Sequence, residues 1–296
     1  MHKLQIQNLS KIYPNGVHAL KNISLTINDG MFGLLGPNGA GKSSLMRIIA
    51  TIQEPSSGTV TFNEKDIIRN PEYIRKQIGF LPQEFGVYPK ISAEQLLDHL
   101  AILKGISQKN ERKEQIWALL QQTNLFEYRK KAVHTFSGGM KQRFGIAQAL
   151  LGNPQLIIVD EPTAGLDPEE RNRFLNLLSE IGEKKVVILS THIVEDIREL
   201  CAQMAILGMG EIINHGNPLE ITKSLEGRIW TKTINRASLP EYQNKFKIIS
   251  TRLVAGKTQI HVYSNSLPDG GFQAAAPDLE SVYFTTLSKV HHPVHI

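Results

Sequence analysis

The feature that most constrains this chain is a glycine-rich loop, G-P-N-G-A-G-K-S, at positions 36–43. An apolar run at 31–35 precedes the loop, and leucine and isoleucine recur at helical spacing after it, at positions 45, 48 and 49. The loop is therefore expected to join a buried strand to an amphipathic helix. Together with the further apolar runs described below, it predicts an α/β fold built on a parallel sheet.

The residue types in this loop suit the binding of phosphate. Gly36, Gly39 and Gly41 allow backbone angles that a side chain would forbid, so that main-chain N–H groups can close on phosphate oxygens. The following helix directs its positive end at the same anion. Lys42 supplies a mobile cation, and the Ser43 hydroxyl can ligate Mg²⁺. A glycine turn beside a surface lysine is the alternative. The expected loop contacts are Gly36, Pro37, Asn38, Gly39, Ala40, Gly41, Lys42, Ser43 and Ser44.

A second apolar run, at 156–159, ends in two adjacent carboxylates, Asp160 and Glu161. It is expected to form another buried parallel strand, and ligands of open α/β sheets gather at the carboxyl ends of such strands. Adjacent residues on an extended chain point in opposite directions, so the two acids should have different roles. Asp160 is placed to hold Mg²⁺ through its water shell, and Glu161 to face the terminal phosphate and polarise water. A solvated turn is the alternative.

A third segment, Ser137-Gly138-Gly139-Met140, precedes residues with helical spacing. Ser137 is expected to cap a helix, and its two glycines leave backbone N–H groups uncovered at the positive helix end. The segment is thus a candidate second anion site, with an ordinary glycine-rich cap as the alternative.

Together these segments resemble the nucleotide-binding subunits of ABC (ATP-binding cassette) transporters. The phosphate loop and the strand ending in Asp are shared with many NTPases, whereas the Ser-Gly-Gly segment distinguishes this family. The resemblance extends to Gln83, to Asp167 just past the acidic pair, to His192, and to Tyr13, which matches the aromatic that stacks on adenine. Phe136 and Met140 depart from the Leu and Gln of many members.

The resemblance implies an ATPase that uses Mg²⁺. Lys42 and the metal, held by Ser43, Gln83 and Asp160, would offset charge on the transferred phosphoryl group. Glu161 would orient or deprotonate water, and His192 would contact the γ-phosphate. In this family the Ser-Gly-Gly segment reaches the nucleotide held by the opposite subunit. Because the chain has one loop and one such segment, it is expected to need a second ATP-binding subunit, either a second copy of this chain, which is favoured, or a paralogue.

Two of these residues could also have a purely structural role. A histidine after a strand is often a structural group, and Tyr13 before Pro14-Asn15-Gly16 would also suit a turn with an anchoring ring. In both cases the family spacing favours function. Met204 and Met209 are expected to be packing residues.

Composition limits the possible partners. The chain has 296 residues, 41% of them hydrophobic, and a net charge of +5. Its basic residues are scattered, so nucleic-acid binding is not expected. A single cysteine excludes an internal disulfide and suits the cytosol. No apolar stretch reaches eighteen residues, so the membrane path must come from a separate transmembrane permease. The chain would then sit peripherally at the cytoplasmic face of the membrane.

The organisation follows from the strand and helix patterns. We expect a P-loop NTPase (RecA-like) core whose strands are the apolar runs at 31–35, 78–81, 156–159, 186–189 and 204–207. An N-terminal antiparallel subdomain is also expected, because apolar residues alternate at 4–6 and 23–27. A helical subdomain is expected at about 86–153, starting at a capping box formed by Ser92 and Gln95. Residues 1–222 would form the cassette. Residues 223–296, called here the C-terminal extension, are expected to form a small α+β unit with short strands at 228–230, 247–249 and 259–263. Its closing helix at 278–284 resembles those of exporter ATPases.

The sequence therefore predicts an ATPase subunit that drives a separate permease, for export rather than import. The alternative is a soluble ABC ATPase acting in cofactor-cluster assembly or ribosome handling. A P-loop kinase or GTPase is disfavoured, because the N-K-x-D guanine motif is absent and the Ser-Gly-Gly segment would be unexplained.

Overall fold

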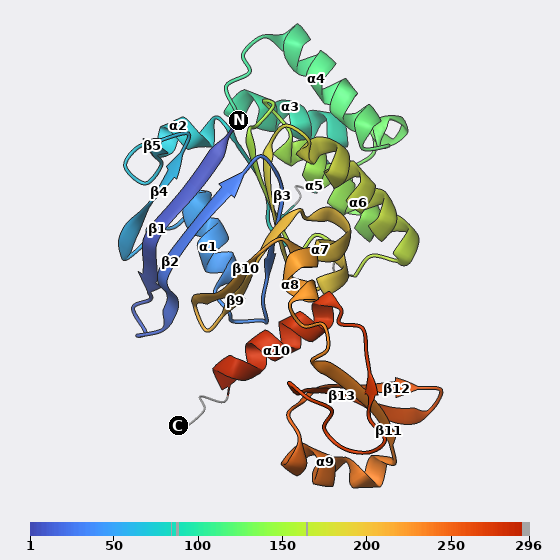
Figure 1. Cartoon of the computed structure of the whole chain (residues 1–296). Coiled ribbons are helices and arrows are strands. Elements are labelled where there is room, and N and C mark those ends of the chain that lie inside the picture. Colours follow the sequence, from blue (N-terminus) through green and yellow to red (C-terminus); the bar gives the residue numbers. More distant parts are fainter. Residues whose placement is uncertain (84, 87–88, 164, 292–296) are drawn as a thin grey trace.

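The computed structural model describes residues 1–291 except 84, 87, 88 and 164, and Figure 1 shows their arrangement. Three β-sheets and the helices packed on them make up this part of the chain. Within it, no helix has both the length and the apolar character needed to cross a membrane.

The central sheet has the order β10-β9-β3-β8-β7-β6. Its strands are β3 (Gly30–Leu35), β6 (Ile78–Leu81), β7 (Leu156–Asp160), β8 (Val186–Thr191), β9 (Gln203–Gly208) and β10 (Glu211–Gly216). Five strands are parallel and β10 is antiparallel to β9. Every residue of β7 and β8 is buried, as expected for strands covered on both faces. The five predicted core strands are confirmed.

An antiparallel sheet of order β2-β1-β4-β5 lies beside the central sheet. It contains β1 (Lys3–Ile12), β2 (His18–Asn28), β4 (Ser57–Phe62) and β5 (Lys65–Asp66). Ile6 opposes Leu25 and Leu4 opposes Ile27, so the alternating apolar residues share one buried face, as predicted. Helix α1 (Lys42–Ile49) packs with both sheets in one core cluster, and α2 (Pro71–Arg75) follows β5.

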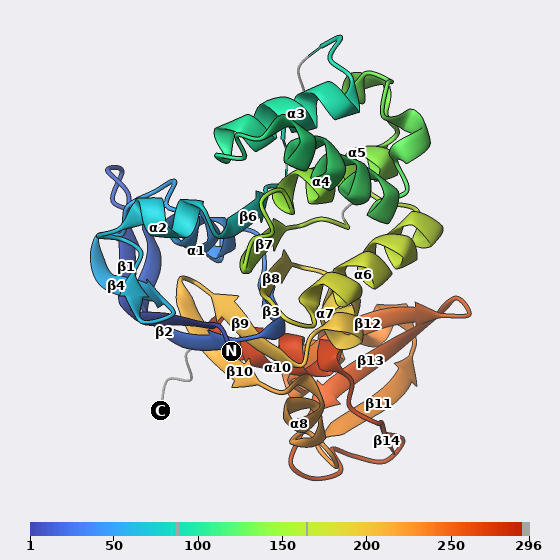
Figure 2. The ribbon, with the colours of Figure 1, turned by 90° about the horizontal axis from the view of Figure 1, so that it is seen from above.

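Helices α3, α4 and α5 gather at one end of the molecule (Figure 2). The segment consists of α3 (Ala93–Leu103), α4 (Lys109–Gln122), the 3-10 turns Phe126–Tyr128 and Val133–Thr135, and α5 (Gly138–Ala149). The capping box at Ser92 and Gln95 is confirmed, with each side chain bonded to the other residue's backbone N–H. Phe144 is fully buried and meets Phe136 edge to face, which anchors α5 in the core.

Two further helices pack beside the central sheet, α6 (Pro168–Gly182) and α7 (Val194–Leu200). A side chain at Gly33 of β3 would collide with α7, because a Cβ there would lie 2.3 Å from Ile197 Cδ1 and 3.2 Å from Cys201 Sγ. Cys201, the sole cysteine of the sequence, is buried. Burial, with the nearby charge of Asp196, raises the pKa of its thiol.

Asp196 is the centre of a buried polar network. Its carboxylate is fully buried and accepts hydrogen bonds from Thr163 Oγ1 at 2.5 Å and from Arg171 Nε at 2.8 Å. Thr191 Oγ1 lies 3.4 Å from the same carboxylate. The network therefore ties the end of β8 to α6, to α7 and to the segment after β7.

The C-terminal residues form a third sheet of order β12-β13-β11-β14. The elements are α8 (Pro218–Lys223), β11 (Ile229–Ile234), the 3-10 turn Arg236–Ser238, α9 (Leu239–Lys245), β12 (Ile248–Val254), β13 (Lys257–Tyr263), β14 (Gln273–Ala274) and α10 (Leu279–His291). The three strand patterns and the closing helix agree with expectation. Helix α9 was not expected.

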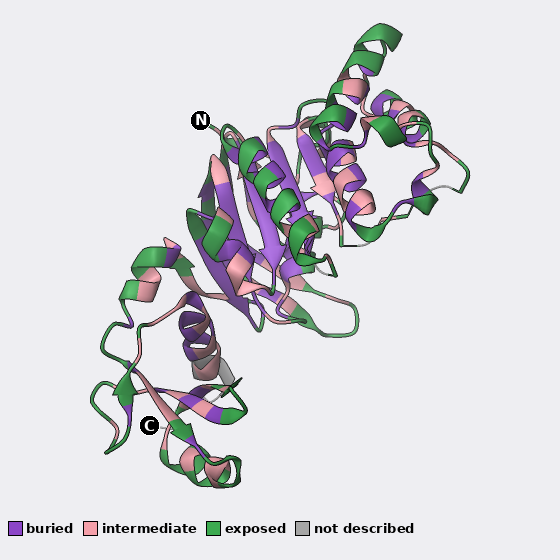
Figure 3. Ribbon diagram, turned by 90° about the vertical axis from the view of Figure 1, so that its right-hand side faces the viewer, coloured by how far each residue is buried: buried purple, intermediate pink, exposed green. Residues whose placement is uncertain are grey.

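Helix α10 returns to the main body and contacts α7, α8, β9, β10 and β12. Its Leu279, Val282 and Tyr283 are buried in the larger core cluster (Figure 3 colours buried residues purple). On its first turn Glu280 and the preceding Asp278 pair with Arg252 of β12. Helix α10 thereby connects the C-terminal sheet to the central sheet, and Ile229 of β11 and Ile249 of β12 belong to the same core cluster.

Candidate functional site

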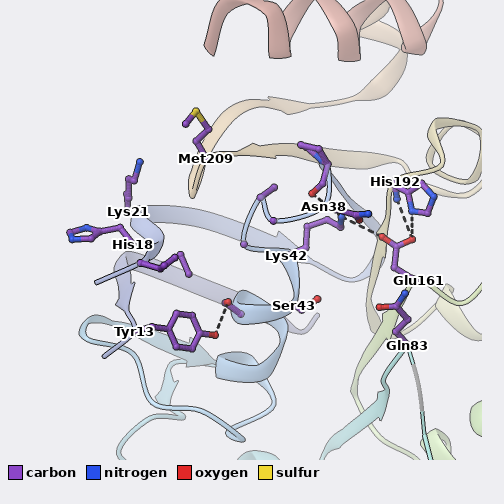
Figure 4. A pocket seen from close by; sticks show the side chains of 17 residues that line it. Tyr13, His18, Lys21, Asn38, Lys42, Ser43, Gln83, Glu161, His192 and Met209 are labelled. Atoms are coloured by element: carbon purple, nitrogen blue, oxygen red, sulfur yellow. Dashed lines mark hydrogen bonds and ion pairs between the residues drawn. The ribbon is translucent and has the colours of Figure 1, made fainter. Parts of the chain in front are cut away.

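Most residues predicted to bind nucleotide meet in one cavity of about 480 Å³, shown in Figure 4. The predicted residues that line it are Tyr13, Pro37, Asn38, Gly39, Ala40, Gly41, Lys42, Ser43, Ser44, Gln83, Glu161 and His192. They come from the carboxyl ends of β3, β6, β7 and β8 and from the segment between β1 and β2. Residues as far apart in the sequence as Tyr13 and His192 therefore line the same cavity.

The phosphate loop passes into α1 without a side-chain cap. Gly41 is the N-cap residue and has φ 108°, and Gly39 has φ 79°. A Cβ at Gly41 would also lie 2.3 Å from the Ala19 carbonyl oxygen. The free N–H groups of the first turn of α1 therefore face the cavity, where they can bind an anion.

Gly36 is glycine for a different reason from the predicted one. Its φ is not positive, so backbone freedom does not require glycine there. A Cβ at this position would instead lie 2.4 Å from the carbonyl oxygen of Leu207 in β9. The start of the loop is thus held against the neighbouring strand.

Lys42 and Glu161 form a buried ion pair at one side of the cavity. Lys42 Nζ lies 3.3 Å from Glu161 Oε1 and donates to the carbonyl oxygens of Gly36 at 2.6 Å and Pro37 at 3.3 Å. Glu161 Oε2 lies 2.6 Å from His192 Nδ1. The carboxylate is therefore held between an ammonium group and an imidazole ring (Figure 4).

Glu161 is oriented by a change in backbone direction rather than by strand alternation. The strand ends at Asp160, and Glu161 has φ 49°, in the left-handed region. Its N–H still donates to the Ser190 carbonyl oxygen at 2.8 Å. We expected the two acids to point in opposite directions because both would lie on one extended chain. This geometry was wrong, because Glu161 is not in the extended conformation. Glu161 lines the cavity and Asp160 is buried behind it.

Asp160 and Ser43 fit a magnesium site. Oδ1 of Asp160 is buried and has no hydrogen-bond partner among the described residues, so it can accept one from a metal-bound water. Ser43 is exposed to the cavity. No cluster of three acidic, histidine or cysteine ligands occurs in the described part of the chain. A magnesium ion that shares its coordination between one or two side chains, water and substrate phosphates needs no such cluster.

Tyr13 borders the cavity at the end away from Glu161 (Figure 4). Its hydroxyl lies 3.0 Å from Ser44 Oγ and 3.2 Å from Gln53 Oε1. The hydrogen bond with Ser44 is the main reason that the pKa of the phenol is below its ordinary value. These bonds fix the ring beside the loop, where a base could stack on it.

The remaining predicted residues lie outside the group that lines this cavity. Ser137 caps α5 and accepts a hydrogen bond from Met140 N–H at 3.2 Å, as predicted. Ser137 and Gly138 are exposed, whereas Gly139 is buried against Glu170. Asp167 caps α6 and accepts from Glu170 N–H at 2.9 Å. The Ser-Gly-Gly turn thus has an exposed face that the phosphate loop of its own chain does not occupy.

Sequence reasoning missed five lining residues: Val17, His18, Ala19, Lys21 and Met209. The first four follow Tyr13 closely, and that spacing could have suggested them. Met204 is fully buried, as expected. The assignment of Met209 to packing was wrong, because its side chain is 55% exposed in the turn between β9 and β10.

Comparison with known proteins gives matches along most of the chain. The ABC transporter family profile matches residues 20–164. The linearmycin resistance ATP-binding protein LnrL of Bacillus subtilis (strain 168) is 35% identical over 76% of this chain and 72% of its own. The methionine import ATP-binding protein MetN 2 of Bacillus anthracis is 30% identical over 80% of this chain and 74% of its own.

Solved structures agree with these sequence matches. A dimeric, post-hydrolysis structure of the ATP-binding cassette MJ0796 bound to ADP and Pi has a TM-score of 0.66 and 28% identity. The alignment covers 72% of this chain and 98% of that one.

The fold and the cavity define a P-loop ATPase with an α/β core. More narrowly, the chain belongs to the ATP-binding subunits of ABC transporters, which hydrolyse ATP with Mg²⁺ as cofactor.

Proposed function

We propose that this chain binds ATP in the cavity between Tyr13 and Glu161. The adenine ring would stack on Tyr13, and the phosphates would lie along residues 36–44 at the amino end of α1. Mg²⁺ would be held by Ser43, by Gln83 and, through water, by Asp160. The observation that carries this proposal is the convergence of these separate segments on one cavity of about 480 Å³.

Hydrolysis is assigned to the group formed by Lys42, Glu161 and His192. Phosphoryl transfer is accelerated mainly by positioning and by stabilising charge. Lys42 is already 3.3 Å from Glu161 and need only turn toward the phosphates. The Glu161 carboxylate, held by His192, would then accept a hydrogen bond from the attacking water. Bound Mg²⁺ supplies positive charge beside the phosphate oxygens.

The exposed Ser137-Gly138-Gly139 turn is proposed to bind the nucleotide of a second subunit. Its helix end can stabilise an anion, and it does not line the cavity of its own chain. Asp167, at the start of α6, would lie in the same interface. We propose that a second copy of this chain is the partner, so that two ATP molecules are enclosed between two chains. The dimeric MJ0796 structure supports this arrangement.

We further propose that residues 1–222 act as the cassette, with 86–153 as its helical subdomain and 223–296 as an extension. The cassette would drive a separate transmembrane permease from the cytoplasmic face of the membrane. Export is favoured by the closing helix α10 and by the resistance protein among the relatives, although relatives also include an import protein.

The hydrolytic role of Glu161 is tested by Glu161→Gln in the full chain. The amide keeps the size of the side chain but cannot accept a proton, so turnover should fall about 10²–10⁴-fold. The Kd for ATP should stay close to that of the unaltered chain. The matched control is Glu72→Gln, because Glu72 is exposed and pairs only with Arg75 among the described residues. Ordinary steady-state hydrolysis by Glu161→Gln would remove Glu161 from the mechanism.

The permease is tested by purifying tagged Glu161→Gln from detergent-solubilised membranes of its own source with ATP and Mg²⁺. A multi-spanning protein in stoichiometric amount supports the transporter. A purely soluble complex would instead indicate the alternative, an ABC ATPase in another process. With the permease in proteoliposomes, substrate on the side of the ATP-binding subunits should stimulate ATPase activity if transport is export. Stimulation only from the opposite side contradicts export.

A further inference from the structure

The turn between β9 and β10, Met209–Gly210, is unusual in its residues. Gly208 pairs with Glu211, and both central residues have positive φ, 48° at Met209 and 84° at Gly210. This is the geometry of a type I′ hairpin turn, whose first central position favours Asn, Asp or Gly. A methionine held there is an outlier that suggests a use outside the turn itself. Its side chain lines the nucleotide cavity.

The same turn is bonded to the phosphate loop. Gly210 N–H donates to the Ala40 carbonyl oxygen at 3.1 Å, and the Gly210 carbonyl accepts from Lys21 N–H at 2.8 Å. A Cβ at Gly210 would lie 3.0 Å from the Ala19 carbonyl oxygen, so glycine permits this close approach. Leu207 of β9 also lies against Gly36 at the start of the loop. The end of β9 and the turn after it therefore contact the phosphate loop at two places, Gly36 and Ala40.

The last helix of the chain packs against the end of the same strand. Helix α10 contacts both β9 and β10. A Cβ added at Gly208 would lie 2.2 Å from Ile213 Cδ1 of β10 and 3.5 Å from Leu287 Cδ2 of α10, so both side chains lie beside this glycine. One turn earlier on α10, Tyr283 is buried, and burial together with the charge of Glu161 raises the pKa of its phenol. In Figure 4 the pale red helix above Met209 is α10. The C-terminal extension therefore reaches the edge of the nucleotide site.

We infer that the Met209–Gly210 turn is a positioning element through which the C-terminal extension sets the geometry of the phosphate loop, with Leu287 as the contact. This inference rests on the proposed nucleotide site. Leu287 lies beside Gly208 at the end of β9, and Gly210 N–H in the following turn binds the Ala40 carbonyl oxygen. Loosening that contact leaves the loop N–H groups less preorganised for phosphate, which weakens binding. By reciprocity, bound nucleotide must stabilise the packing of α10.

The test compares Leu287→Ala with two other variants of the full chain. Leu287→Met, which refills the space, should behave as the unaltered chain. The control Leu253→Ala, which shortens an exposed side chain of β12, should do so as well. Leu287→Ala should raise both the Kd and the KM for ATP about fivefold and leave kcat nearly unchanged. A merely structural role would lower the melting temperature without changing the Kd, and that result would overturn the inference.

A second measurement on the unaltered chain keeps the inference testable if Leu287→Ala does not fold. Saturating ATP with Mg²⁺ should slow amide hydrogen exchange in 207–213 and 279–288, while exchange in β13 stays unchanged. Equal exchange in 279–288 with and without bound ATP would overturn the inference. Absence of any ATP binding by the unaltered chain would refute the proposed nucleotide site, and this inference with it.

Discussion

The two glycines at the start of α5 provide a matched pair of positions for a stability experiment. Among the described atoms, a Cβ at Gly138 would meet none within 4 Å. A Cβ at Gly139 would lie 2.4 Å from Glu170 Oε2 and 2.9 Å from its Cδ. The carboxylate is not free to swing away, because Arg143 holds it at 3.4 Å and Arg173 at 3.1 Å. Alanine should therefore be tolerated at Gly138 and resisted at Gly139.

The magnitude follows from comparing the two substitutions. Alanine improves helix propensity by up to about 1 kcal/mol at either position, so this gain largely cancels between them. Overpacking costs about 1–3 kcal/mol and falls on Gly139→Ala alone. Gly139→Ala should then be less stable than Gly138→Ala by about 1–3 kcal/mol. Urea unfolding of both variants, with their m-values, measures this difference. Coincident unfolding curves would refute the packing of Glu170 on this turn.

Three further predictions concern stability. Burial, with the charge of Arg252, lowers the pKa of His261 from 6.5. Between this lowered pKa and pH 6.5, the unfolded chain therefore binds a proton that the folded chain does not. The contribution of His261 to the free energy of unfolding should fall as pH drops through 6.5. His261→Gln should therefore make the slope against pH smaller in urea titrations at several pH values; equal slopes would contradict this prediction. Asp196→Ala leaves Arg171 without its charged partner and should lower the free energy of unfolding by about 3–5 kcal/mol in the same assay. A change near zero would exclude the network as a stabilising element. Phe144→Ala empties a fully buried site and should cost about 3–5 kcal/mol, measured by thermal unfolding; a melting temperature that does not change would show that the core refills the space.

The parts of the fold that the sequence predicted depend on local pattern. The five buried strands are continuous apolar runs, and the caps at Ser92 and Ser137 involve residues only three positions apart. Asp167 could have been read in the same way, since Pro168 and Glu170 follow it as in a helix start. Asp167 was instead predicted to contact the nucleotide, whereas its observed hydrogen bond is with the Glu170 N–H of α6.

The parts that the sequence did not predict depend on contacts between distant segments. Nothing near Gly36 indicates that Leu207 will lie against it. Met209 follows an apolar run and therefore resembles a core residue, but the hairpin turn places it at the surface, beside the cavity. Helix α9 has seven residues, and only two of them, Leu239 and Tyr242, pack on the core of the third sheet. Two apolar residues are too few to reveal a helical period in the sequence.

Cys201 has a practical consequence for experiments on this chain. The thiolate is the form that reacts with maleimides, and burial with a raised pKa keeps Cys201 in the unreactive thiol form. A cysteine introduced at an exposed position should therefore carry a fluorescent or spin label alone, with Cys201 left in place. Any slow labelling of Cys201 itself would measure how often α7 separates from β3. The native thiol thus reports the opening of the segment that follows His192.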